Sequence, residues 1–141
     1  MKKTLLRLTR LLFILVLLTT AIGKLLDNRG FADIIANYQL IPSELGLYVG
    51  LAVSLFELFL GLAIAIEKRL RVCAGLVVLL QAGYLLLACV TIFRGIRLQN
   101  CGCFGVFWGR PLTFYTVLED FILLLIAILF YQLTLDRREK K

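Results

Sequence analysis

The sequence has no histidine, and its single methionine is the first residue. Without histidine the chain cannot build a His-ligated zinc or haem site, nor a Ser–His or Cys–His catalytic couple. Without further methionines it cannot form the Met-rich sites that bind copper. Charge is also scarce, at 18% of the 141 residues. Thiols and carboxylates are therefore the groups left to carry chemistry.

Long apolar runs occupy most of the chain. The hydrophobic fraction is 61% and the mean hydropathy is +0.94, which is too apolar for a water-soluble core in a chain this short. No strict apolar–polar alternation occurs, and an open sheet cannot satisfy its backbone in lipid. We therefore predict an all-α fold, a polytopic membrane four-helix bundle that forms one integral membrane domain over residues 1–141. The predicted spans are about 5–26, 45–66, 72–93 and 114–135, and the outer loops are 27–44 and 94–113.

Basic residues predict the orientation of these spans. The two terminal segments and the second connection hold 11 Lys and Arg residues, against 5 in the other two connections. By the positive-inside rule, both termini are cytoplasmic and both predicted outer loops are extracytoplasmic. The net charge of +7 is explained by topology and anionic lipid headgroups. Because the charges flank spans and form no patch, no nucleic-acid partner is expected.

Residues 1–23 are similar to a signal peptide as well as to a span, with a basic start, an apolar run and then Thr19-Thr20-Ala21. Cleavage there would leave three spans in the same orientation. We predict an uncleaved first span, because the apolar run continues to Leu26 and Lys24 can snorkel to the interface.

The two outer loops differ in their patterns. In 27–44, apolar residues recur at the spacing of a short amphipathic helix, namely at Phe31, Ile34, Ile35 and Tyr38. We expect this helix to end by Ile41-Pro42 and to lie in the outer interface as a lid. The loop 94–113 contains four glycines and the aromatic residues Phe104, Phe107 and Trp108. It is predicted to be irregular and anchored at the interface.

Cys101-Gly102-Cys103 is the sharpest chemical feature of the sequence. Thiols on the extracytoplasmic side meet oxidising conditions. A disulfide between residues i and i+2 needs a restricted backbone, which Gly102 helps to supply, and a strained, exposed disulfide exchanges readily. A disulfide that closes so short a ring adds little stability to the fold. We therefore favour an exchangeable catalytic pair over a structural disulfide. An inert staple and Cu(I) ligation by the two thiolates are the alternatives.

Cys89 in the third span has two interpretations. Gly75, Ala82 and Cys89 recur every seven residues, which indicates a small-residue face for close helix packing. Cys89 would then be a buried thiol that acts as a small hydrophobe. Alternatively, it is a third catalytic thiol that exchanges with the loop pair, since it lies about 6 Å below the outer end of its helix. Cys73, at the other end of that helix, is predicted to be structural.

Glu57 is predicted to lie near the middle of the second span, on a stripe of small residues that faces the bundle interior: Gly46, Gly50, Ser54 and Gly61. An ionisable group at that depth costs at least ~2.5 kcal/mol on insertion scales, which makes it a functional candidate. Gln81 in the third span has a similar depth and is a candidate partner. Glu57 either handles protons or contacts a cofactor, or it forms a buried structural hydrogen bond.

Glu119 and Asp120 follow each other about 8–9 Å below the outer end of the last span. Adjacent helix positions point about 100° apart, so we expect one carboxylate to reach interface water and the other to point inward beneath the cysteines. The inward carboxylate would accept the proton of a thiol that becomes an attacking thiolate. The alternative is pairing with the loop arginines, Arg94, Arg97 or Arg110.

Several segments together match a known pattern: GKLLD at 23–27, the stretch 30–42 from Gly-Phe to Pro, Glu57 before Gly61, CGCFG at 101–105, and Asp120. In these segments the chain resembles the MauE family of the DoxX-like membrane proteins, over nearly its whole length. The resemblance implies thiol–disulfide traffic at the outer face of a bacterial inner membrane. MauE is needed to mature the disulfide-rich small subunit of methylamine dehydrogenase, beside a thioredoxin-like periplasmic partner. By position, Cys101 and Cys103 would be the redox pair, and Glu57 and Asp120 the buried polar residues.

The sequence therefore predicts an inner-membrane redox protein, lying in the lipid bilayer, that exchanges disulfides with a thioredoxin-like partner or a secreted client. As an enzyme it would be a thiol–disulfide oxidoreductase. Repeated oxidation requires an electron sink, for which a membrane quinone or Cys89 as a relay is our hypothesis. A non-catalytic assembly factor or scaffold is the second hypothesis, and a small-molecule or Cu(I) transporter with Glu57 on its path is the third.

Overall fold

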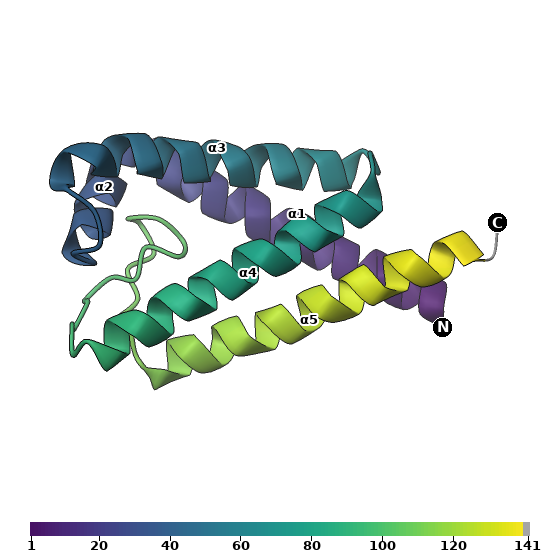
Figure 1. Cartoon of the computed structure of the whole chain (residues 1–141). Helices are drawn as coiled ribbons and strands as arrows, with labels where there is room; N and C mark the ends of the chain where they lie inside the picture. The colour runs from purple at the N-terminus through teal and green to yellow at the C-terminus, as the bar shows by residue number, and fades with distance from the viewer. Residues whose placement is uncertain (140–141) are drawn as a thin grey trace.

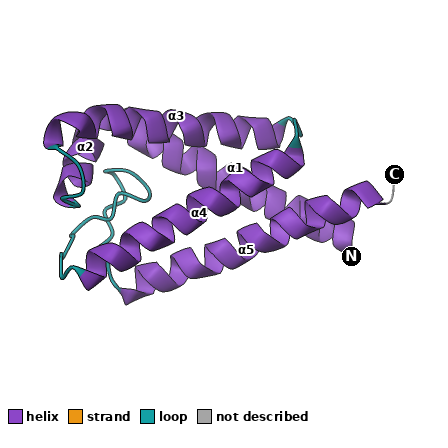
Figure 2. Ribbon diagram, in the orientation of Figure 1, coloured by secondary structure: helices purple, strands orange, loops and turns teal. Residues whose placement is uncertain are grey.

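The computed structural model describes residues 1–139, and throughout that range its regular elements are helices (Figures 1 and 2). They are α1 (Lys2–Leu26), α2 (Asn28–Asn37), the short 3-10 helix η1 (Ser43–Leu45), α3 (Gly46–Ala65), α4 (Leu70–Phe93) and α5 (Phe114–Glu139). The helices α1, α3 with η1, α4 and α5 are long and apolar enough to cross a membrane. The predicted all-α membrane bundle of four spans is confirmed, with bounds that differ by a few residues.

The long helices pack mainly as two antiparallel pairs, α1 with α3 and α4 with α5 (Figure 1). The two chain ends lie at one end of the bundle, which we call the terminal end. At the opposite end the pairs diverge, and α2 and the loop 94–113 lie between and over them. We call this the cysteine end, and 94–113 the cysteine loop. The fold thus places an irregular segment where the helices leave room for it.

An apolar core joins the two pairs in the half of the bundle nearer the terminal end. Phe13 of α1 and Phe130 of α5 are fully buried, and their rings stack with centroids 5.7 Å apart. Cys73 lies in the same core, 6% exposed, and its thiol donates to the Lys68 carbonyl oxygen at 3.2 Å. The predicted structural position of Cys73 is therefore confirmed.

Arg10 of α1 binds the turn between α3 and α4 through hydrogen bonds and an ion pair. Its Nε donates to the Ile64 carbonyl oxygen at 3.1 Å, and its Nη2 donates to the Ala65 carbonyl oxygen at 2.7 Å. It also forms an ion pair with Glu67. Because the last carbonyls of a helix have no partner within the helix, this arginine supplies a donor to Ala65 and a second donor to Ile64, whose carbonyl oxygen also accepts from the Glu67 amide.

Asp27 separates α1 from α2. Its backbone leaves the helical region, and its carboxylate accepts a hydrogen bond from the Gly30 amide at 2.9 Å, which caps α2. The amphipathic face predicted for this segment is confirmed, since Phe31, Ile34 and Tyr38 are buried and Ile35 is partly buried against the same cluster. The helix ends at Asn37, four residues before Ile41. The chain then passes through Gln39, whose backbone is left-handed. The apolar face packs on the cysteine loop in a second core cluster that includes Ala88, Leu98, Cys101 and Leu112.

Candidate functional site

The cysteine loop is held in shape by its own backbone. The amide of Cys101 donates to the Arg110 carbonyl oxygen at 2.8 Å, and the amide of Leu112 donates to the Leu98 carbonyl oxygen at 2.9 Å. These two bonds join the arms of the loop. Between the arms, residues 101–105 (CGCFG) form the loop tip, which a hydrogen bond from the Gly105 amide to the Gly102 carbonyl oxygen closes at 3.1 Å.

Both glycines of the loop tip are required by the geometry. Gly102 and Gly105 have φ values of +71° and +81°, in the region that favours glycine. A Cβ on Gly105 would lie 2.5 Å from the backbone of Gly23, and one on Gly102 would lie 2.9 Å from the Ile34 side chain. The tip therefore lies directly against α1 and α2. Irregular backbone at this depth of a bundle is tolerated where protein surrounds it.

The two thiols of the tip have different surroundings. Cys101 is 6% exposed and lies under α2, where the Tyr38 hydroxyl donates to its carbonyl oxygen at 2.6 Å. Cys103 is partly exposed because it lines a cavity below the tip. The expectation of an exposed pair is therefore wrong for Cys101, because the apolar face of α2 folds over the tip. Both cysteines are free thiols here.

Contact between the Cys101 and Cys103 thiols shifts their pKa values in opposite directions. The Cys103 thiol donates a hydrogen bond to the Cys101 sulfur and, with help from the Cys103 amide and Arg110, lowers the pKa of Cys101 to about 7. The same hydrogen bond, together with burial, raises the pKa of Cys103 far above its ordinary value. Cys101 is thus the thiol that becomes a nucleophilic thiolate near neutral pH, and Cys103 keeps the proton.

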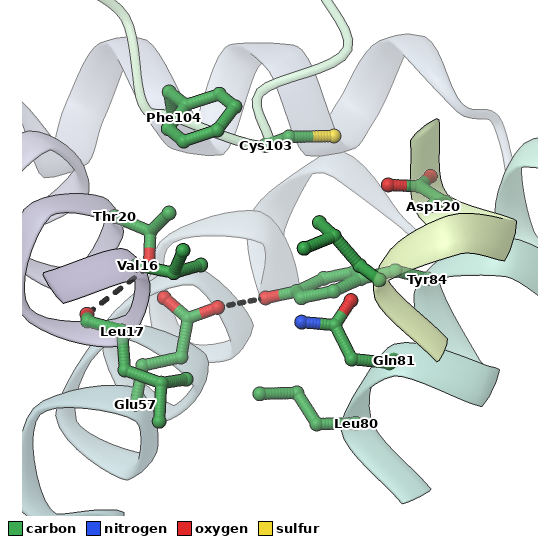
Figure 3. A pocket seen from close by; sticks show the side chains of 11 residues that line it. Val16, Leu17, Thr20, Glu57, Leu80, Gln81, Tyr84, Cys103, Phe104 and Asp120 are labelled. Atoms are coloured by element: carbon green, nitrogen blue, oxygen red, sulfur yellow. Dashed lines mark hydrogen bonds between the residues drawn. The ribbon is translucent and has the colours of Figure 1, made fainter. Parts of the chain in front are cut away.

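A cavity of about 30 Å³ lies beneath the loop tip (Figure 3). Its polar lining comes from the tip and from all four long helices, and consists of Cys103, Thr20, Glu57, Gln81, Tyr84 and Asp120. A cavity needs roughly 10–15 Å³ to hold a water molecule, so this one has room for at least one. The structure thus brings Cys103 together with every acidic or amide side chain proposed from the sequence except Glu119.

Glu57 lies at the bottom of this site and is 1% exposed, on the interior stripe that the sequence predicts. Its carboxylate accepts two hydrogen bonds from Lys24 Nζ, at 2.8 and 2.9 Å, and another from the Tyr84 hydroxyl. The proposed partner Gln81 is 3% exposed and lines the cavity beside these residues. Among the described residues, Lys24 and Tyr84 are therefore the partners of Glu57, which corrects the pairing with Gln81.

Lys24 is fully buried, so the expectation that it snorkels to the interface is wrong. Its ammonium group also lies over the rings of Phe31 and Tyr84, 5.3 and 4.9 Å from their centroids. We call Lys24, Glu57 and Tyr84 the ion cluster. The sequence held one signal for it, since a carboxylate buried in mid-span needs a cationic or hydrogen-bonding partner.

The two neighbouring acids of α5 have the split environments that the helix geometry predicts. Glu119 faces outward and pairs with Arg110, whose Nη2 lies 2.6 and 2.5 Å from the two carboxylate oxygens. Asp120 faces inward, is 8% exposed and lines the cavity. Its Oδ2 is buried without a hydrogen-bond partner among the described residues.

Cys89 is exposed on α4, so the interpretation as a buried thiol at a close helix contact is wrong. The helix buries another face, which includes Ala74, Val77, Gln81 and Ala88. A seven-residue repeat marks a face of a helix without saying whether a neighbour covers it. The role of Cys89 as an exchanging thiol stays a prediction.

The fold and the site define a multi-pass helical membrane protein in which a two-cysteine loop closes one end of the bundle above a buried ion cluster. The chain belongs to the family described as methylamine utilisation protein MauE, whose family model matches residues 2–132. The match runs from the start of α1 into the last turns of α5, and it confirms the resemblance seen in the sequence. No curated protein and no solved structure matches the chain. Family membership makes this a methylamine-utilisation-associated membrane protein.

Proposed function

We propose that the protein carries out thiol–disulfide exchange, with Cys101 and Cys103 cycling between a dithiol and a disulfide. The observation that carries this proposal is the contact between the two thiols on one loop, with the pKa of Cys101 lowered to about 7. Near neutral pH this arrangement supplies a thiolate and, beside it, a second thiol that can close the ring.

In the exchange, the Cys101 thiolate attacks one sulfur of a partner disulfide. A Cys101–partner bond forms, the partner disulfide breaks, and one partner sulfur leaves as a thiolate. Cys103 then attacks the Cys101 sulfur, which forms the Cys101–Cys103 disulfide and releases the second partner sulfur. Two electrons pass from the pair to the partner, and the reverse sequence oxidises a partner dithiol.

We propose a thioredoxin-like protein or a secreted disulfide-containing client as the partner. Access to Cys101 requires α2 to move away from the loop tip, because Tyr38, Phe31 and Ile34 cover it. We therefore propose that α2, a helix of 10 residues, makes this movement as a unit. The partner would then contact the tip in the space that α2 leaves.

We place the cysteine end on the periplasmic side of a bacterial inner membrane, with both termini in the cytoplasm. The support is the excess of Lys and Arg in the two terminal segments and the α3–α4 connection of the sequence, 11 against 5 in the other two connections. A cysteine-free variant with Trp108→Cys, at an exposed loop position, should react with a membrane-impermeant maleimide in intact cells. The matched variant Lys68→Cys, in the turn at the opposite end, should react only after the membrane is opened. The opposite pattern would overturn this orientation.

The proposed exchange is tested by trapping the first covalent complex. Cys103→Ser leaves Cys101 able to attack a partner but unable to close its own ring, so mixed disulfides should accumulate in cells and disappear on reduction. The double variant Cys101→Ser/Cys103→Ser is the control that should trap nothing, and Cys89→Ser should behave like the parent. If Cys103→Ser traps no protein, or the double variant traps the same proteins, thiol exchange at this pair is refuted.

A membrane assembly factor is the second candidate function. The observation that favours it is the burial of Cys101, 6% exposed, in a tip that packs against α1 and α2 as a structural plug would. In that case the thiols shape the loop and exchange nothing. A double variant Cys101→Ala/Cys103→Ala that keeps full activity in cells would favour the assembly factor, and loss of activity with normal protein levels would favour exchange.

A further inference from the structure

Asp120 carries a buried oxygen that the fold leaves without a partner. The residue is 8% exposed, and its Oδ2 accepts no hydrogen bond among the described residues. A buried carboxylate oxygen without a donor is costly, and such an oxygen in a native fold needs an explanation. Since Asp120 lines the cavity beneath the loop tip, the explanation should lie in what the cavity holds or what borders it.

The side chain that borders Asp120 across the cavity is Cys103. Figure 3 shows the Cys103 sulfur pointing from the loop tip toward the Asp120 carboxylate, whereas Glu57 lies at the opposite, lower side of the cavity. The cavity has room for at least one water molecule between its polar groups. The Cys103 thiol, which must lose a proton during exchange, and the Asp120 carboxylate, which can accept one, therefore face the same cavity.

The other charged groups around the cavity are already engaged. On α1 and α3, Lys24 and Glu57 form an ion pair, and the Tyr84 hydroxyl of α4 donates to that same carboxylate. At the loop and on α5, Arg110 pairs with Glu119. The Glu57 carboxylate is therefore already engaged by two donor side chains, which leaves Asp120 as the available proton acceptor among the described residues of the site.

We propose that Asp120 accepts the proton of Cys103 when the Cys101–Cys103 disulfide forms, and returns it when that disulfide is reduced. The inference rests on the proposed exchange function and adds the path of its proton. The step needs such a group because Cys103 is the thiol that holds its proton near neutral pH, while only the thiolate attacks.

The step balances in both directions. In oxidation of the pair, the S–H bond of Cys103 breaks, its proton passes to Asp120 directly or through one water, and its sulfur forms a bond to Cys101. The bond between Cys101 and the partner breaks, and the partner leaves as a thiolate with the two electrons. In reduction, a partner thiolate attacks Cys101, the Cys101–Cys103 bond breaks, and the released Cys103 thiolate takes the proton back from Asp120.

The test uses the full-length protein in nanodiscs, with oxidised glutathione as the disulfide probe, and measures the two steps separately. Formation of the Cys101–glutathione adduct reports the attack, and release of glutathione from that adduct reports ring closure by Cys103. Asp120→Asn should leave attack within about twofold and should slow ring closure by roughly a hundredfold near pH 7, the lower end of general-base effects. Ring closure should recover as pH rises, because hydroxide replaces the missing base.

Glu119→Gln is the matched control, since it removes the neighbouring carboxylate that pairs with Arg110 outside the cavity. It should leave the rate of ring closure and its pH profile unchanged. A merely structural role of Asp120 would instead slow attack and closure together, at all pH values. Either that result, or an Asp120→Asn protein whose closure matches the parent, overturns the inference while leaving exchange itself intact.

Two further outcomes keep the tests distinct. If the parent protein forms no glutathione adduct and no disulfide, both the exchange function and this inference are refuted. If Asp120→Asn does not fold, as judged by its thermal unfolding in nanodiscs, Asp120→Ser is measured with the same two readouts. That smaller side chain also removes the carboxylate, so the same slow, pH-dependent closure is expected.

Discussion

The ammonium group of Lys24 donates to both carboxylate oxygens of Glu57, at 2.8 and 2.9 Å, although the two residues are 33 positions apart and both are shielded from solvent. The pair joins α1 to α3, and the Tyr84 hydroxyl adds α4. Removing two charges from water is costly, and the cost is recovered only while each charge keeps its partner. The ion cluster therefore fixes three helices around the base of the cavity.

Breaking this pair from one side should destabilise the bundle strongly. We expect Lys24→Met or Glu57→Leu to lower the free energy of unfolding by about 3–5 kcal/mol, because each leaves an uncompensated buried charge. The double variant Lys24→Met/Glu57→Leu should lose much less than the sum of the two. A double-mutant cycle from unfolding in detergent measures this, and additive losses would contradict it.

Gly105→Ala should be far more damaging than Gly95→Ala, although both residues have positive φ, +81° and +74°. At Gly95 nothing lies within 4 Å of the added Cβ, so only the left-handed strain applies, roughly 1–2 kcal/mol. At Gly105 the Cβ would also lie 2.5 Å from the backbone of Gly23. Thermal unfolding and the alkylation rate of Cys101 measure the difference. Equal effects of the two variants would show that the tip does not pack against α1.

The Cys101 thiol should react with iodoacetamide in a pH-dependent way centred near pH 7. Its pKa is lowered to about 7, first by the hydrogen bond from Cys103, so the thiolate fraction rises through neutrality and levels off above pH 8. In Cys103→Ala that donor is lost, and the midpoint should move up toward the ordinary value near 9. Both proteins carry Cys73→Ser and Cys89→Ser, and mass spectrometry reads the modified site. A parent midpoint near 9 would contradict the contact between the thiols.

Tyr38→Phe should open the cover over Cys101. The substitution removes the hydrogen bond from the Tyr38 hydroxyl to the Cys101 carbonyl oxygen, and an unsatisfied buried carbonyl costs about 1–3 kcal/mol. We expect alkylation of Cys101 to accelerate severalfold, because α2 leaves the tip more often. Tyr115→Phe, at a 79% exposed residue, is the control that should change neither rate nor stability. An unchanged alkylation rate in Tyr38→Phe would mean that this contact does not limit access.

Arg10→Gln should destabilise the turn at the terminal end by about 1–3 kcal/mol, because the Ile64 and Ala65 carbonyl oxygens lose a charged donor. The loss is attributed to these two bonds more than to the partly exposed pair with Glu67. Arg7→Gln removes the same charge from an exposed position of α1 and should change stability by less than about 0.5 kcal/mol. Thermal unfolding of the two variants in one detergent makes the comparison, and equal shifts would refute the role of Arg10.

Much of the architecture could be read from local patterns, because each pattern is set by a physical rule that acts within one element. Backbone groups in lipid must be satisfied within their own segment, so the four apolar runs had to be helices. A rotation of about 100° per residue sends Glu119 and Asp120 to different environments, whatever their neighbours are. The same periodicity placed Glu57 on an interior stripe and identified the buried face of α2.

The sequence by itself thus determined the helices, the loop that carries the two cysteines, and the faces that polar residues share. Only the tertiary structure decided which of those faces meet. The first turns of α3 lie beside α2, where Ala32 contacts Gly46. The last turn of α1 therefore lies beside the middle of α3, at the level of Glu57, and Lys24 is buried there. Cys101 is covered because α2 folds back on the loop tip, and Cys89 is exposed because α4 turns another face to its neighbours. These outcomes depend on contacts between distant segments, and a periodic pattern within one helix holds no information about which segment will pack against it.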